Sequence, residues 1–98
     1  MATHALSTES VQEALSELNG WEHDDNMITK TYEFDSYLAG VAFAAAVGTV
    51  AEGRDHHPDM LVTWRKVKVS FTTHDAGSKV TQKDVDAAQA VEALGYPS

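Results

Sequence analysis

Three of the five histidines, His56, His57 and His74, carry the side chain that is best suited to proton transfer near neutral pH. His56 and His57 are adjacent, and a pair of imidazoles can supply both a general acid and a general base. Glu52 and Asp55 lie just upstream, and Glu52 shares a helical face with His56 if the helix extends that far. Carboxylates beside imidazoles fix the ring tautomer and stabilise the charged ring. The sequence therefore predicts an acid–base site built from these five residues.

Two other interpretations of the same histidines stay open at this point. Adjacent histidines in an acidic chain are compatible with an ordinary exposed surface. His56, His57, His74 and a carboxylate could also bind a divalent metal, because imidazole with carboxylate is a common ligand set for zinc or iron. The chain has no H-E-x-x-H motif, however, and without cysteine it offers no thiolate ligand and no cysteine nucleophile. We therefore expect a site without a metal.

A β-hairpin over residues 59–73 is expected to bring two of these histidines together. Two alternating apolar runs meet at Arg65-Lys66, which indicates a turn there. Centring the turn on these residues puts six apolar side chains on one face, paired as Trp64 with Val67, Val62 with Val69, and Met60 with Phe71. The same register, continued past Pro58, pairs His57 with His74 at the open end of the hairpin.

Helices and strands alternate along the rest of the chain in a simple order. A first helix is predicted from Ser7 to Leu18, two strands over residues 21–23 and 27–34, and a second helix from Asp35-Ser36 to Gly53. A third helix begins at Thr81, with Asp84 as its capping acid, and ends before Gly95. The predicted order is helix-strand-strand-helix-strand-strand-helix, within a single domain over residues 1–98.

The composition narrows the classes of function. Seven Lys and Arg residues stand against fifteen Asp and Glu residues, a formal net charge of −8, which disfavours binding to nucleic acid or to an anionic membrane. The longest apolar run, residues 41–47, is too short to span a bilayer. The absence of cysteine favours a reducing compartment, and we expect the cytoplasm.

At these residues the sequence resembles the pterin-4a-carbinolamine dehydratases. The likeness rests on Glu52-Gly53-Arg54-Asp55-His56-His57-Pro58, then Trp64, Thr72-Thr73-His74 and Asp84, and it extends over almost the whole chain. One departure is Met60, which stands where members often carry a tryptophan and would alter one wall of the pterin pocket.

The resemblance implies an α+β fold, in which three helices pack on one face of a four-stranded antiparallel sheet. It implies that 4a-hydroxytetrahydropterin is dehydrated to quinonoid dihydropterin without a metal or an organic cofactor. His56 and His74 would share the acid and base roles, and His57 would orient the substrate. The further residues expected at the substrate are Glu52, Asp55, Trp64, Thr72, Thr73, Asp75 and Asp84.

The resemblance also implies a homodimer or homotetramer, to which an exposed sheet edge would contribute. A different class of function stays open, since relatives of this fold serve as non-catalytic adaptors in assembly or dimerisation. An adaptor would not need three histidines and both upstream acids, all of which this chain has.

Overall fold

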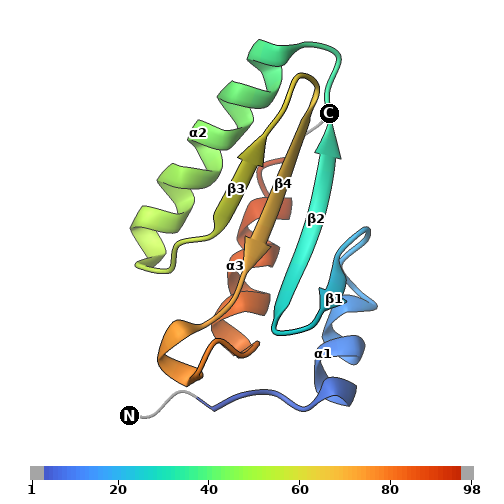
Figure 1. Cartoon of the computed structure of the whole chain (residues 1–98), viewed down its shortest axis with the longest axis vertical. Helices are drawn as coiled ribbons and strands as arrows, with labels where there is room; N and C mark the ends of the chain where they lie inside the picture. Colours follow the sequence, from blue (N-terminus) through green and yellow to red (C-terminus); the bar gives the residue numbers. More distant parts are fainter. Residues whose placement is uncertain (1–3, 96–98) are drawn as a thin grey trace.

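The computed structural model describes residues 4–95 of the chain, and it has three α-helices and one sheet (Figure 1). The strands are β1 (Glu22–Asp24), β2 (Met27–Glu33), β3 (Asp59–Val62) and β4 (Lys66–Phe71). The helices are α1 (Thr8–Leu15), α2 (Tyr37–Arg54) and α3 (Gln82–Glu92), and a short 3-10 helix (His74–Ala76) follows β4. All strand pairs are antiparallel, in the order β1-β2-β4-β3. The predicted α+β class and element order are confirmed.

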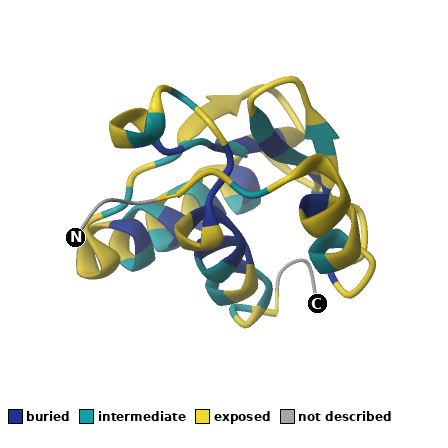
Figure 2. Ribbon diagram, turned by 90° about the horizontal axis from the view of Figure 1, so that it is seen from below, coloured by how far each residue is buried: buried dark blue, intermediate teal, exposed yellow. Residues whose placement is uncertain are grey.

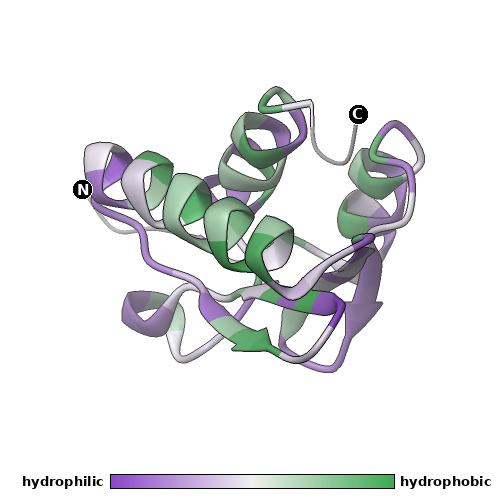
Figure 3. Cartoon of the chain, turned by 90° about the horizontal axis from the view of Figure 1, so that it is seen from above, coloured by the Kyte–Doolittle hydropathy of each residue, from purple (hydrophilic) through white to green (hydrophobic). Residues whose placement is uncertain are grey.

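The hydrophobic core fills the space between the helices and one face of the sheet (Figure 2). Alternate residues of β2 and β4 point into it, and those that are buried are Ile28, Tyr32, Val67, Val69 and Phe71. The helices contribute buried residues that include Val11, Phe43, Val47, Val85 and Val91. Figure 3 shows apolar residues on most turns of the long helix α2, as predicted for a helix that lies on a sheet.

Capping fixes the two helix ends that matter for the site. At the C-terminus of α2, Asp55 adopts the left-handed conformation with φ of 52°, and the chain turns there into the His56-His57-Pro58 segment. At the N-terminus of α3, the Asp84 carboxylate accepts from the Thr81 N–H at 2.8 Å, and the Thr81 hydroxyl accepts from the Lys83 N–H at 3.2 Å. This is the capping box that the sequence predicts.

The register of the β3–β4 hairpin differs from the prediction by two residues. Met60 pairs with Val69 and Val62 with Val67, and the Thr63 N–H donates to the Lys66 carbonyl at 2.8 Å. The turn is therefore centred on Trp64-Arg65, and the predicted pairing of Trp64 with Val67 is wrong. A shift of two residues leaves every side chain on the same face, so the hydrophobic pattern cannot detect it.

This register also overturns the predicted pairing of the histidines. Asp59 pairs with Ser70, so His57, two residues further out, comes level with Thr72 and not with His74. His74 follows in the 3-10 helix, and its side chain is exposed. No helix within residues 4–95 is long and apolar enough to cross a membrane.

Candidate functional site

A cavity of about 340 Å³ lies where the segment after α2 meets the end of β4 and the first turn of α3. Its lining residues are Asp55, His56, His57, Pro58, Asp59, Thr72, Thr73, His74, Asp75 and Lys83. All three predicted catalytic histidines therefore reach one cavity, although the hairpin register that was expected to join them is wrong.

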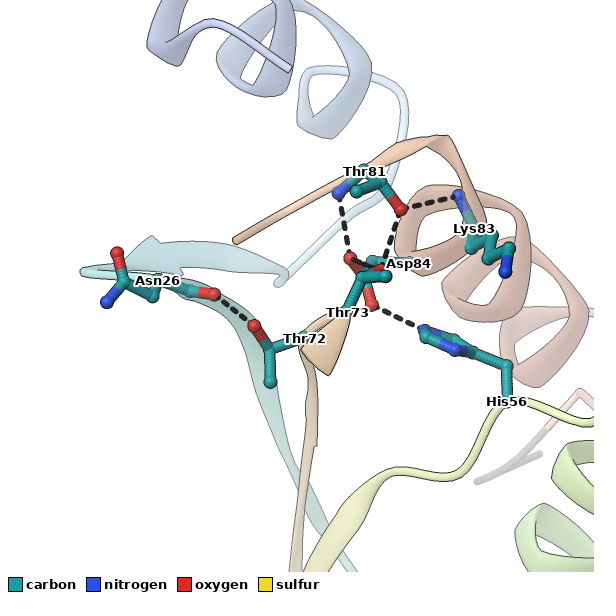
Figure 4. Close-up of polar contacts among 7 residues, drawn as sticks. All are labelled: Asn26, His56, Thr72, Thr73, Thr81, Lys83 and Asp84. Atoms are coloured by element: carbon teal, nitrogen blue, oxygen red, sulfur yellow. Dashed lines mark hydrogen bonds and ion pairs between the residues drawn. The ribbon is translucent and has the colours of Figure 1, made fainter. Parts of the chain in front are cut away.

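His56 is held by a buried carboxylate from a distant part of the chain (Figure 4). Its Nε2 lies 2.6 Å from Asp84 Oδ1, and Asp84 is fully buried while the His56 side chain keeps 14 % exposure. The imidazole also stacks on Phe71, with ring centroids 5.9 Å apart and planes within 10° of parallel. A carboxylate accepts and never donates, so the neutral ring carries its proton on Nε2. Nδ1 is then the nitrogen with a free lone pair.

Asp84 is itself fixed by two further donors. Its Oδ2 accepts from the Thr81 N–H and from the Thr73 hydroxyl, both at 2.8 Å. The Thr73 and Thr81 hydroxyls are 2.7 Å apart (Figure 4). Thr73 and Thr81 are both buried, so water does not compete for these contacts. These contacts hold the carboxylate in one orientation. Through its Oδ1, the carboxylate in turn orients the His56 ring.

His57 and His74 occupy a different environment, because both are exposed. His57 Nε2 contacts Glu52 Oε1 at 2.7 Å, and both of these side chains are more than half exposed. His74 Nδ1 is 3.4 Å from Ser78 Oγ. The three histidines thus comprise one ring fixed against the core and two rings in contact with solvent.

The other residues predicted for the site fall into three groups. Asp55, Thr72 and Asp75 line the cavity, although the Thr72 hydroxyl also donates to the Asn26 carbonyl at 2.6 Å. Glu52 lies outside the lining and acts through its contact with His57.

The third group comprises Thr73 at the wall of the cavity, Asp84 behind it and Trp64 away from it. Asp84 lies behind His56, and Thr73 is at the wall with its hydroxyl turned to Asp84. Trp64 is not brought to this cavity. It is 70 % exposed at the hairpin tip, where the Arg65 guanidinium lies 4.4 Å from the ring centroid, and it lines a separate cavity.

Two polar residues of the lining, Asp59 and Lys83, are not among the site residues predicted from the sequence. Lys83 is the only lysine or arginine among the described lining residues, in which three carboxylates, Asp55, Asp59 and Asp75, also occur. Their positions gave a usable signal, because Asp59 follows the His-His-Pro segment directly and Lys83 adjoins Asp84. Beside the histidines, the cavity therefore offers several carboxylate acceptors and one lysine donor to a polar ligand.

Metal binding finds no support in the side-chain geometry. Among residues 4–95, no group of three or more His, Cys, Asp or Glu side chains is arranged to hold a metal ion. The imidazole of His56 already has its Nε2 engaged by Asp84. The metal-free site stays a prediction, which chelation tests.

Comparison with solved structures shows the same fold in other proteins. A transcriptional coactivator/pterin dehydratase from Brucella melitensis aligns with a TM-score of 0.84 and 30% identity, covering 92% of this chain and 97% of that one. A pterin dehydratase-like protein described as a RuBisCO assembly factor in the α-carboxysome aligns with a TM-score of 0.61 over 80% of this chain and 89% of its own. At 23% identity, the second likeness concerns the fold alone.

Comparison of sequences identifies the family. A protein of Natronomonas pharaonis that is named for pterin-4-alpha-carbinolamine dehydratase is 51% identical over 76% of this chain and 79% of its own length. One from Roseiflexus sp. with the same name is 44% identical over 96% of this chain and 99% of its own. The sequence model of the pterin 4 alpha carbinolamine dehydratase family matches residues 4–94. With its three histidines and the buried aspartate gathered at one cavity, the chain belongs to the pterin 4 alpha carbinolamine dehydratase family.

Proposed function

We propose that the protein dehydrates 4a-hydroxytetrahydropterin to quinonoid dihydropterin and water, by acid–base catalysis with histidines. The observation that carries this proposal is the contact of His56 with Asp84 at the wall of a cavity that His57 and His74 also line. Membership of the dehydratase family supports the reaction type.

The reaction transfers two protons and breaks the C4a–O bond. The N5–H proton is removed, a C4a=N5 double bond forms, and the C4a–O bond breaks as the hydroxyl takes up a proton and leaves as water. We assign the removal of the N5 proton to His56 Nδ1. Asp84 stabilises the imidazolium that results and keeps the acceptor nitrogen free before the transfer.

His74 is assigned the general acid role, because an exposed imidazole can exchange its proton with water between turnovers. His57, oriented by Glu52, positions the substrate. The pterin ring presents several N–H donors, for which Asp55, Asp59 and Asp75 supply acceptors, and Lys83 can donate to the ring carbonyl. No metal and no organic cofactor takes part in these steps.

The test is a stopped-flow measurement of carbinolamine breakdown with the wild-type protein and with His56→Ala. We expect the loss of the base to slow the reaction by roughly 10²–10⁴-fold. His4→Ala is the matched control, because His4 is exposed and does not line the cavity. A wild-type protein that leaves the uncatalysed rate unchanged would refute the proposed function.

We further propose that the partner is a second copy of the chain, paired along β3. All four residues of this edge strand are exposed, and Leu61 keeps 61% of its surface in solvent. Because the Thr63–Lys66 contact directs the backbone groups of alternate residues to β4, those of Met60 and Val62 face the open edge. Two such edges can pair antiparallel about a two-fold axis.

Charge complementarity supports this pairing. If Met60 lies opposite Val62 of the second copy, the tip residues Trp64 and Arg65 reach the Pro58 end of the neighbouring β3. A basic tip then meets the carboxylates of Asp55 and Asp59. Light scattering after size exclusion should give the mass of a dimer or a multiple of it, and Val62→Pro should give monomers because it removes an outward N–H. A monomeric wild-type protein would refute the pairing. The β3 edge would then be free to bind a different protein, as expected of an adaptor.

A further inference from the structure

A chain of buried hydroxyls leads to the carboxylate behind His56. The Thr81 hydroxyl accepts from the Lys83 N–H at 3.2 Å and lies 2.7 Å from the Thr73 hydroxyl, which donates to Asp84 Oδ2 at 2.8 Å. A threonine hydroxyl has one proton, and that of Thr73 is used on Asp84. Thr81 must therefore donate to Thr73. Each hydrogen bond in the series therefore has its donor on the side away from Asp84. Figure 4 shows the contacts of the series as dashed lines.

The series joins two elements of the fold, the end of β4 and the start of α3. Thr73 follows β4, while Thr81 and Asp84 belong to the start of α3. Thr73 keeps 3 % exposure, and Thr81 and Asp84 keep none. Hydrogen bonds in such a dry environment are stronger than in water, and a series with one direction polarises its members.

We propose that Thr73 is a positioning residue for His56, acting through Asp84, and not a substrate contact. This inference rests on the proposed function, since it assumes that His56 is the base. With Oδ2 engaged by Thr73 and by the Thr81 N–H, Asp84 presents Oδ1 to His56 Nε2. The acceptor nitrogen Nδ1 is thereby kept unprotonated. Loss of the Thr73 hydroxyl frees the carboxylate to rotate, and the ring can then take up the other tautomer.

The experiment compares Thr73→Val, which removes only the hydroxyl, with Thr73→Ser, which restores it. In protein labelled with ¹⁵N, two-bond ¹H–¹⁵N spectra distinguish the Nε2–H and Nδ1–H tautomers of each histidine. We expect the Nε2–H form of His56 in the wild type and in Thr73→Ser, and a mixture in Thr73→Val with a dehydration rate lower by about 10-fold or more. Thr72→Val is the control for the spectrum, because the neighbouring Thr72 hydroxyl bonds to Asn26 and not to Asp84.

The outcomes separate the two proposals. A His56 spectrum in Thr73→Val that is identical to the wild type overturns the positioning role, whatever the activity. A wild-type protein without dehydratase activity refutes the proposed function. The His56 tautomer in Thr73→Val would still test whether Thr73 positions His56 through Asp84. If Thr73→Val does not fold, the test is the rate at which the hydroxyl protons of the wild-type protein exchange with water. Protons of Thr73 and Thr81 that exchange slowly with water support the series, and fast exchange of the Thr73 proton overturns it.

Discussion

Asp84→Asn is the substitution that tests the proposed site most directly. The carboxylate accepts three hydrogen bonds, from His56, Thr73 and Thr81, in a fully buried position. An asparagine keeps one acceptor oxygen and replaces the other with an N–H₂ donor. If the oxygen serves Thr73 and Thr81, the amide donor faces His56 Nε2, which must then accept. The ring is driven to the Nδ1–H tautomer, and the acceptor nitrogen at the cavity is lost.

The magnitudes follow from these contacts. Hydrogen bonds to a charged acceptor contribute about 1 kcal/mol more than neutral ones, so three weakened bonds cost about 2–3 kcal/mol of unfolding free energy. The fold survives such a loss in a domain of ordinary stability. The dehydration rate, however, should fall by roughly 10²–10⁴-fold, since the general base is in the wrong protonation form.

The assay combines urea unfolding with stopped-flow rates on the same preparations. Asp86→Asn is the matched control, because Asp86 lies two residues further along α3, bonds only to Gln82 among the contacts described, and does not line the cavity. We expect its rate to equal that of the wild type. A folded Asp84→Asn protein that dehydrates the substrate within about threefold of the wild-type rate would contradict the assignment of His56 as an oriented base.

Four further predictions concern His74, the hydrophobic core, the dependence on metal and the ion pair at the C-terminal end of α3. His74→Ala should change the free energy of unfolding by less than about 1 kcal/mol, because the ring is exposed, but it should slow dehydration by roughly 10²–10⁴-fold. Phe71→Ala removes a buried core side chain and should lower the free energy of unfolding by about 3–5 kcal/mol in urea melts. Dialysis against EDTA should leave the rate unchanged, and restoration by zinc or iron of a rate lost on dialysis would show the metal-free mechanism to be wrong. Burial alone would raise the pKa of Glu92, but hydrogen bonds from Tyr32 and Lys30 outweigh it and lower the pKa below the ordinary 4.5. The stability that Glu92 contributes is therefore present above about pH 4.5 and lost as the pH falls further, and Glu92→Gln should flatten this part of the stability curve in melts taken between about pH 3 and 7.

The order of helices and strands could be predicted from the sequence because its signals are local. Ser36 and Thr81 mark helix starts by capping the next turn, and each cap is satisfied within a few residues. The apolar alternation in β4 likewise fixes which residues face the core. The sequence of β2 alternates less clearly, because Lys30 lies on the same side of the strand as the buried Ile28 and Tyr32. The structure resolves it by placing the Lys30 ammonium 3.0 Å from Glu92 at the rim of the core.

The hairpin register shows where local signals are insufficient. Side-chain alternation has a period of two, so the predicted pairing and the observed one satisfy it equally. In the observed register the Thr63 N–H donates to the Lys66 carbonyl across the turn. The Phe34 N–H, just after β2 and distant in sequence, donates to the Arg65 carbonyl at 2.8 Å. Trp64 is consequently at the tip, away from the cavity that it was expected to line.

The sequence by itself determined which residue types are available for proton transfer, and it placed His56 and His57 side by side as equivalent imidazoles. Only the tertiary structure decided that one is fixed and the other exposed. The partners of His56 are Phe71 and Asp84, which come from β4 and α3, whereas His57 contacts Glu52 of the helix just before it. Burial and tautomer depend on atoms that are brought close by packing, and packing between distant segments is not encoded in the spacing of neighbouring residues.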